Sequence, residues 1–212
     1  MKVMIHACPK RLWYVERYLA PSLVEQGLEP VIWNDAEGYG CLASCLRSFR
    51  SAQCEWHLQD DVLIARNFAE LAHKYDSGVV AGFCFAQSGD DSGCVGRVYA
   101  PDLWHGFPCV RVPIDYALAY CDWVDGPDHD EREWYAIKHN KGDDFLFHEW
   151  HDKFHAREMV VNAVMVEHVD WLIGGSVVND WRGYICRNDL WTDEALVDEL
   201  RERLTTEPIP MI

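Results

Sequence analysis

Apolar and polar residues form alternating blocks along the first 85 residues, and the blocks switch between the periodicities of strands and helices. Short apolar runs, typical of strands buried in a parallel sheet, occupy residues 2–8, 30–34, 54–59 and 79–85. Stretches with helical spacing lie between them, at residues 11–26, 42–52 and 66–75. The order β-α-β-α-β-α-β predicts an α/β fold in which helices cover both faces of a parallel sheet.

The first of these helices has clear signals in the sequence. Leu12, Leu19 and Leu23 share one face of the helix. Gly27 is expected to end it, because glycine adopts the left-handed conformation that is common after helix ends. Pro21 is expected to kink it, because proline cannot donate a backbone hydrogen bond.

The second half of the chain is less regular. Helical spacing predicts helices at residues 114–124, 144–154 and 193–204, and residues 160–169 have the pattern of an extended segment. Three segments have the composition of loops or turns, at residues 86–97, 125–142 and 173–179. Because no internal repeat or linker divides the chain, we expect one domain over residues 1–212.

Charge narrows the classes of function. The 212-residue chain has a formal net charge of −16. A field of this sign repels phosphate backbones, which argues against broad nonspecific binding to nucleic acid. Six acidic residues and one arginine lie within residues 122–133, and this run is expected to form a solvated loop.

Cysteine usage and the N-terminal residues indicate a compartment. The nine cysteines form no CxxC motif and no zinc-ligand spacing, and four of them lie in apolar runs: Cys8, Cys54, Cys84 and Cys109. Buried, reduced thiols are therefore expected, as in a reducing cytoplasm. The first residues lack the apolar stretch of a signal peptide, and no run approaches the ~20 apolar residues of a membrane span. We expect a cytoplasmic protein without a membrane span.

Asp60 and Asp61 are the most informative polar residues, because they end an apolar strand in the stretch CEWHLQDDV, residues 54–62. Open α/β sheets bind ligands at the carboxyl ends of their strands. Adjacent carboxylates raise each other's pKa unless a cation lies beside them. Mn²⁺ or Mg²⁺ would remove this conflict, since both ions prefer carboxylate oxygen. A solvated turn without a ligand is the alternative.

The stretch HLQDDV resembles the aspartate metal motif of glycosyltransferases with the GT-A fold, which hold a metal ion there against the diphosphate of a nucleotide-sugar. The resemblance extends loosely from residue 3 to about residue 180. Two blocks, ACPKRLWYVERYLAPSL and DWLIGGSVVN, are similar to compact glycosyltransferases encoded by phages, which would place the protein in the host cytoplasm.

This resemblance implies a Rossmann-like, GT-A-like fold with a mixed, mainly parallel central sheet flanked by helices. Residues 1–85 would form the half that binds the nucleotide-sugar. Residues 86–212 would form the half that binds the acceptor and completes the metal site.

The resemblance also assigns the metal ligands. Asp61 is expected to bind Mn²⁺ or Mg²⁺ directly, and Asp60 to contact the sugar or to act through water. Gln59 replaces the first acid of the common pattern. His168 stands in an extended apolar run and matches the late histidine that completes the metal shell in this fold. Taken without the resemblance, His168 fits a core histidine.

An acidic pair on the acceptor side lies in NKGDDFLFHEW, residues 140–150, which is similar to the acceptor-side acidic motif of the family. A carboxylate near a helix start is favoured by the helix dipole. Asp144 is expected to deprotonate the acceptor hydroxyl, with Asp143 as the second candidate. Simple capping of the helix is the alternative for either residue.

The resemblance also implies that the nucleotide contacts the ends of the first two strands. Cys8, Pro9 and Arg11 follow the first strand, and Asn34 and Asp35 end the second. Asp35 would accept hydrogen bonds from ribose hydroxyls. Arg11 would bind phosphate.

These residues predict a metal-dependent glycosyltransferase that moves a sugar from a nucleoside-diphosphate sugar to a hydroxyl acceptor. UDP is the favoured nucleotide, and inversion at the anomeric carbon is expected. A modified DNA base, a glycan, a protein or a small molecule fits as acceptor. Two alternatives are a metal-dependent nucleotide phosphohydrolase and a non-catalytic protein that binds nucleotide-sugars.

One further group of potential ligands lies on the predicted helix at residues 144–154 and just beyond it. His148, His151, Asp152 and His155 share one helix face, a spacing that can bind zinc. The HExxH pattern is absent from this stretch. A polar helix face is therefore the preferred interpretation.

Overall fold

The computed structural model describes residues 1–7, 9, 11–34, 42–85, 109–154 and 159–168. The described strands are β1 (Lys2–Ala7), β2 (Glu29–Asn34), β3 (Trp56–Gln59), β4 (Val62–Ile64), β5 (Val80–Phe85), β6 (Cys109–Arg111) and β7 (Met159–His168). The described helices are α1 (Leu12–Tyr14), α2 (Ala20–Glu25), α3 (Leu42–Arg50), α4 (Phe68–Lys74), α5 (Ile114–Val124), α6 (Glu131–Lys138) and α7 (Asp143–Phe154). The predicted helix at residues 193–204 and the predicted loops at 86–97 and 173–179 lie outside the described residues.

The strands form one mixed sheet in the order β2-β1-β3-β6-β5-β7-β4. Strand β1 is parallel to β2 and β3, and β5 is parallel to β7. Strand β6 is antiparallel to both β3 and β5, and β4 is antiparallel to β7. Five strands therefore run in one direction, which confirms the prediction of a mainly parallel α/β sheet.

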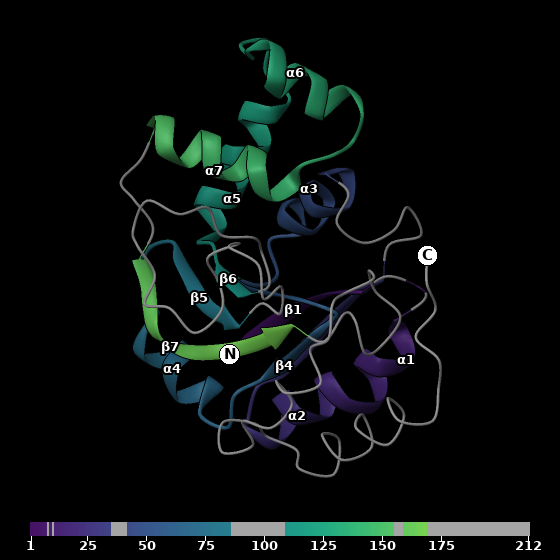
Figure 1. The fold of residues 1–212 in the computed structure, drawn as a ribbon, viewed down its shortest axis with the longest axis vertical. Helices are drawn as coiled ribbons and strands as arrows, with labels where there is room; N and C mark the ends of the chain where they lie inside the picture. Colours follow the sequence, from purple (N-terminus) through teal and green to yellow (C-terminus); the bar gives the residue numbers. More distant parts are fainter. Residues whose placement is uncertain (8, 10, 35–41, 86–108, 155–158, 169–212) are drawn as a thin grey trace.

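Helices cover both faces of this sheet and create two cores (Figure 1). Helices α2 and α4 and the segment around α1 pack on one face, where Ile5, Leu58 and Phe68 are fully buried. Helices α3, α5, α6 and α7 pack on the other face, around Phe49, Tyr120 and Phe147. Burial of these large apolar side chains supplies the main driving force for the layered arrangement.

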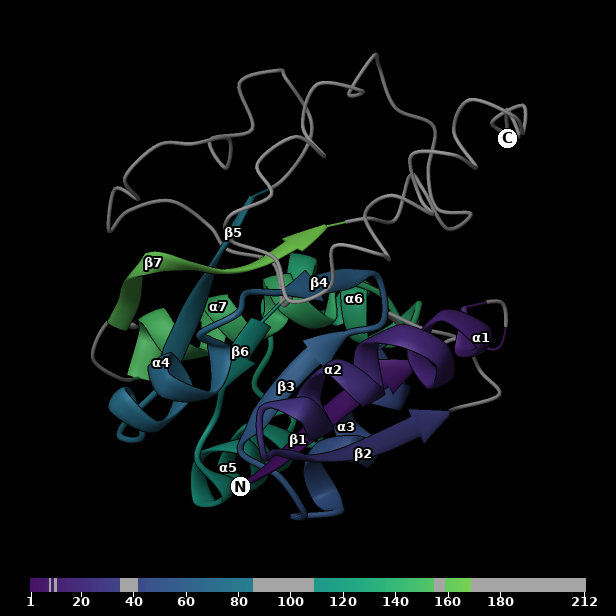
Figure 2. The same cartoon turned by 90° about the horizontal axis from the view of Figure 1, so that it is seen from below.

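Strand β7 curves strongly, and β4 pairs with its curved end (Figures 1 and 2). Strand β4 follows β3 after two residues, so the Cα atoms of Gln59 and Val62 are at most about 11 Å apart. In the hydrogen-bonding order, however, three strands separate β3 from β4. The sheet must therefore bend until the end of β7 meets the end of β3.

A π-helical turn at Val15–Leu19 joins α1 to α2. The backbone N–H of Ala20 donates to the carbonyl of Val15, five residues earlier. The wide turn lies directly before Pro21, which has no N–H to donate and whose ring would crowd the carbonyl four residues back in a regular α-helix. The predicted continuous helix with a kink at Pro21 is corrected accordingly. Gly27, with a φ of 75°, follows α2 as predicted.

The acidic run at residues 122–133 and the predicted loop at 125–142 are not continuous loops, and this prediction is wrong. Helix α6 begins there with a capping box, in which Asp130 accepts hydrogen bonds from the backbone of Arg132 and Glu133 at 3.0 and 2.9 Å. The Glu133 side chain accepts one from the backbone N–H of Asp130 at 2.9 Å. These bonds satisfy donors that a helix start leaves open, so the acids stabilise a helix.

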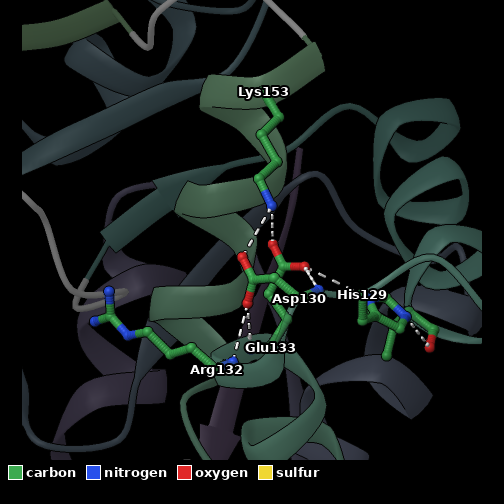
Figure 3. Close-up of polar contacts among 6 residues, drawn as sticks. His129, Asp130, Arg132, Glu133 and Lys153 are labelled. Atoms are coloured by element: carbon green, nitrogen blue, oxygen red, sulfur yellow. Dashed lines mark hydrogen bonds and ion pairs between the residues drawn. The ribbon is translucent and has the colours of Figure 1, made fainter.

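Glu133 also joins α6 to α7 (Figure 3). Its carboxylate is buried, with 1% of the side chain exposed, and it pairs with the ammonium group of Lys153 on α7. The same ammonium lies 3.4 Å from Asp130. One lysine therefore compensates two carboxylates that would otherwise repel each other, and it fixes the two helices together.

Within the described residues, four cysteines are buried as free thiols: Cys45, Cys54, Cys109 and Cys121. Burial raises the pKa of the Cys54 thiol to about 11 and that of Cys109 further. The prediction of buried, reduced thiols is thus confirmed for Cys54 and Cys109. Cys8 and the side chain of Cys84 lie outside the described part of the chain. Among the helices that the structure describes, none is long and apolar enough to cross a membrane.

We expect Lys153→Met to lower the free energy of unfolding by about 2 kcal/mol, because the buried Glu133 carboxylate would lose a charge-assisted partner. Urea unfolding at pH 7 measures the change. Lys138→Met is the matched control, since Lys138 is exposed near the end of α6, and it should change stability by less than about 0.5 kcal/mol. Equal effects of the two substitutions would show that the α6–α7 contact does not depend on Lys153.

Candidate functional site

The turn after β3 places Asp60 and Asp61 against Arg11. Arg11 Nη2 lies 3.0 Å from Asp60 Oδ1, and Arg11 Nη1 donates a hydrogen bond to Asp61 Oδ2 at 2.5 Å. Asp60 is fully buried and Asp61 is 6% exposed. Two adjacent carboxylates out of water need a nearby cation, and the guanidinium group supplies one. The three side chains together still carry one formal negative charge.

The start of the first helix holds this turn from two sides. The carbonyl of Arg11 accepts hydrogen bonds from the backbone N–H groups of Tyr14 and Val15 at 2.9 and 3.2 Å, which fixes the backbone beneath the arginine side chain. One turn later, the fully buried Tyr14 donates its hydroxyl to the carbonyl of Val62 at 2.9 Å. Arg11 and Tyr14 therefore contact the two ends of the Asp60–Val62 turn.

The end of β7 lies beside the same turn. His168, the last residue of β7, pairs with Val62 in the antiparallel β4–β7 ladder. Directly opposed residues in such a ladder have Cα atoms about 4.5–5.5 Å apart, so the His168 backbone is close to Asp61. The described part of His168 is its backbone. The prediction that a late histidine joins the acid pair is consistent with this placement.

The first three parallel strands end together at this edge of the sheet. His6 is in register with Gln59, and Ala7 is in register with Asn34. Pro9 and Asn34 are exposed there. Cys8 and Asp35 lie outside the described residues. Arg11 was expected to bind phosphate, and in the structure its guanidinium group contacts the two aspartates.

The second predicted acid pair, Asp143 and Asp144, opens helix α7. Asp144 Oδ1 accepts a hydrogen bond from the backbone N–H of Phe145 at 2.7 Å. Burial, and then the charge of Asp144, raise the pKa of the Asp143 carboxyl to about 7. Burial also raises the pKa of Asp144, against the opposing effects of the Phe145 amide and of His148. The Asp143 carboxyl is therefore suited to proton transfer near neutral pH, and the pKa of Asp144 is shifted in the same direction.

A hydrogen bond connects this acid pair to the carboxyl end of the sheet. Asn140, three residues before Asp143, accepts a bond from the backbone N–H of Ala43 at 2.6 Å. Ala43 lies in the first turn of α3, the crossover helix that begins at the end of the sheet where β2 ends. The segment before α7 is thus bonded to the start of α3.

Two histidines lie on the sheet face beneath α3 and were missed by the sequence analysis. His6 Nε2 and His57 Nδ1 are 3.0 Å apart, and Ser48 Oγ on α3 lies 3.4 Å from His6 Nε2. Burial lowers the pKa of His6 to about 4 and that of His57 well below its usual value, so the pair is uncharged at neutral pH. The signal was present in the sequence, because each histidine interrupts an apolar strand.

The acid pair has the donor chemistry of a site for Mn²⁺ or Mg²⁺. Magnesium sites often use one or two carboxylates and complete the shell with water and substrate phosphates. Within the described residues, no group of three or more His, Cys, Asp or Glu side chains could hold a metal ion. Asp60 and Asp61 have the carboxylate oxygens that such an ion binds, and in the structure one oxygen of each contacts Arg11.

The alternative zinc group on α7 is not supported by the contacts of its described residues. His151 is 2% exposed and stacks on Phe147, with ring centroids 6.1 Å apart and planes 8° apart. Asp152 is exposed. His155 lies outside the described part of the chain. His151 is thus a packed aromatic residue on the face of the sheet that α3, α5, α6 and α7 cover.

Comparison of the chain with protein-family models, with curated proteins and with solved structures gave no match.

We expect Asp143→Asn to stabilise the protein more at pH 8 than at pH 5. The folded-state pKa of Asp143 is raised from 3.8 to about 7, so its favourable contribution is complete below pH 3.8 and is lost as pH rises through 7. Asparagine does not ionise, and after allowance for partial exposure the gain at pH 8 is about 1–2 kcal/mol.

Thermal or urea unfolding at the two pH values measures this difference. Asp115→Asn, at an exposed aspartate in the first turn of α5, is the control and should show the same small effect at both. A pH-independent effect of Asp143→Asn would mean that this carboxyl titrates normally.

Proposed function

We propose that the protein is a metal-dependent glycosyltransferase that uses a nucleoside-diphosphate sugar, with UDP as the favoured nucleotide. The observation that carries the proposal is the buried Asp60–Asp61 pair at the carboxyl end of β3, with the end of β7 paired beside it. Parallel sheets bind ligands at this edge. Burying two adjacent carboxylates there is costly, and binding a cation that a diphosphate also ligates gives the arrangement a function.

The residues of the acid pair have separate roles in this proposal. Asp61 and His168 would hold Mn²⁺ or Mg²⁺, and Asp60 would contact the sugar or act through water. The bound ion would supply positive charge to the diphosphate as it leaves. The ends of β1 and β2, including Pro9 and Asn34, would contact the nucleotide, with Cys8 and Asp35 beside them.

The second acid pair would activate the acceptor. Asp144 would accept the proton of the acceptor hydroxyl as that oxygen attacks the anomeric carbon, with Asp143 as the alternative base. The raised pKa values of both carboxyls support a role in proton transfer. Attack by the acceptor itself, with departure of the diphosphate from the opposite side, gives inversion at this carbon.

Donor binding is the first test. UDP-, GDP-, ADP- and TDP-sugars are each added with Mn²⁺ and again with EDTA, and the melting temperature is recorded. A donor at 100 times its Kd stabilises by about 2.7 kcal/mol. For a chain of this size, that corresponds to a rise of roughly 5–10 °C. We expect the melting temperature to rise with the sugars of one nucleotide family, and only when Mn²⁺ is present.

Asp61→Asn should abolish this rise. Asp76→Asn is the control, because Asp76 is exposed between α4 and β5, and it should keep the rise. If no donor gives a metal-dependent shift in melting temperature, the proposed donor site is wrong. Release of inorganic phosphate from nucleotides would instead identify a phosphohydrolase, and donor binding without turnover a binding protein.

Asp144→Asn should reduce turnover by about 10²–10⁴-fold, the usual contribution of a general base, while the donor-induced melting shift is unchanged. Hydrolysis of the donor by water gives a measurable turnover when no acceptor is known. Asp152→Asn, at an exposed aspartate on the same helix, is the control. NMR of the product anomer is the independent check, and a retained configuration would exclude Asp144 as the base.

A further inference from the structure

We propose that Arg11 is an internal counter-ion of the acid pair, which it exchanges for the divalent ion when the donor diphosphate binds. The proposal rests on the function proposed above and adds a control step to the same site. Without metal, the guanidinium group of Arg11 pairs with both Asp60 and Asp61 and offsets one of their two negative charges. With metal and donor bound, the ion would bind Asp61, Asp60 would contact the sugar or act through water, and Arg11 would bind the diphosphate.

The contacts of Arg11 place it in direct competition with a metal ion. Its two terminal nitrogens contact two different carboxylates, at Asp60 Oδ1 and Asp61 Oδ2, and its side chain is 11% exposed. In the proposed site, Mn²⁺ or Mg²⁺ would bind the Asp61 carboxylate directly and act on Asp60 through water or the sugar. A divalent ion and a guanidinium group at the same oxygens repel each other, so the two cations exclude one another.

Charge favours the exchange once a diphosphate is present. One guanidinium group leaves the buried pair with a formal charge of −1, whereas a divalent ion neutralises it fully. Hydrated Mg²⁺ and Mn²⁺ release their water reluctantly, and substrate phosphates complete their shell. The diphosphate also offers the displaced Arg11 a two-point partner of the kind that arginine prefers.

The local backbone permits the side chain to move without unfolding the turn. The carbonyl of Arg11 is held by the N–H groups of Tyr14 and Val15, and Tyr14 holds the carbonyl of Val62. These bonds do not involve the guanidinium group. The side chain can therefore leave the carboxylates while the start of the helix and the turn stay in place.

Linkage gives the exchange a measurable signature. If diphosphate binding draws Arg11 away from the aspartates, diphosphate must raise the affinity for the metal, and the metal must raise the affinity for the diphosphate by the same factor. If the role of Arg11 were purely structural, its replacement would leave the affinity for the metal unchanged.

The test measures Mn²⁺ binding by the EPR signal of free Mn²⁺, with and without UDP, for the wild type, Arg11→Met and Arg11→Lys. Arg17→Met is the matched control, because Arg17 is exposed six residues later and lies over the Tyr18 ring. The melting temperature of each protein is recorded in EDTA and in Mn²⁺. Arg11→Lys keeps a positive charge without the two-point contact and serves if Arg11→Met does not fold.

We expect Arg11→Met to bind Mn²⁺ without UDP at least about tenfold more tightly than the wild type, a change of ~1.4 kcal/mol. UDP should increase Mn²⁺ affinity in the wild type and have a much smaller effect in Arg11→Met. In EDTA, Arg11→Met should melt roughly 10 °C lower, because two buried carboxylates lose their counter-ion, and Mn²⁺ should restore most of this loss. Arg11→Lys should lie between the two, and Arg17→Met should match the wild type.

Two results overturn the proposal, and they can be told apart. If the wild type binds Mn²⁺ and UDP but Arg11→Met and Arg11→Lys show unchanged Mn²⁺ affinity and no rescue by Mn²⁺, the exchange is wrong and the proposed function stands. If neither the wild type nor the Arg11 variants bind Mn²⁺ with or without UDP, both the exchange and the metal-dependent function are wrong.

Discussion

The burial of two neighbouring carboxylates, Asp60 and Asp61, is the constraint around which the carboxyl edge of the sheet is organised. Carboxylates that leave water together carry a large electrostatic cost, and a protein retains them only with compensating charge. Arg11 provides that charge from the end of β1, fifty residues earlier in the chain. The pairing of β1 with β3 is what brings these distant residues to one edge.

The two acid pairs of the candidate site lie in different surroundings. Asp60 and Asp61 are buried against the guanidinium group of Arg11. Asp143 and Asp144 have a raised pKa, because burial outweighs the amide and histidine partners nearby. One pair is thus suited to hold a cation and the other to exchange a proton. Two carboxyl groups with environments this different are a common basis for distinct chemical roles within one site.

The sequence predicted the long, regular elements well, because their periodicity is set by burial. Strands β1, β2 and β3 and helices α3, α5 and α7 lie close to their expected limits. Strands β4 and β6 were missed, since three residues are too few to show a period. Helix α6 was missed because its acids suggested a solvated loop, although Asp130 and Glu133 have the spacing of a capping box.

Tertiary contacts account for the rest of what the sequence did not reveal. The acid pair was identified from its position after a strand, but its pairing with Arg11 depends on the fold and has no local signal. The His6–His57 contact likewise requires β1 and β3 to be neighbours. The placement of His168 beside Val62 depends on the curvature of β7, which brings β4 close to the end of β3.

The strand order also affects how the chain can fold during synthesis. Strand β6 lies between β3 and β5, so these two strands share no hydrogen bonds. Strand β7 lies between β5 and β4 and pairs with both. When the first 85 residues have left the ribosome, the strands β1 to β5 have been made. Of these, only β1, β2 and β3 can form their final parallel pairs, because the parallel partner of β5 is β7. Strands β4 and β5 must wait for residues 109–168, which are made several seconds later at ordinary rates of translation. Until then, the edges of β4 and β5 are exposed to incorrect pairing with other strands.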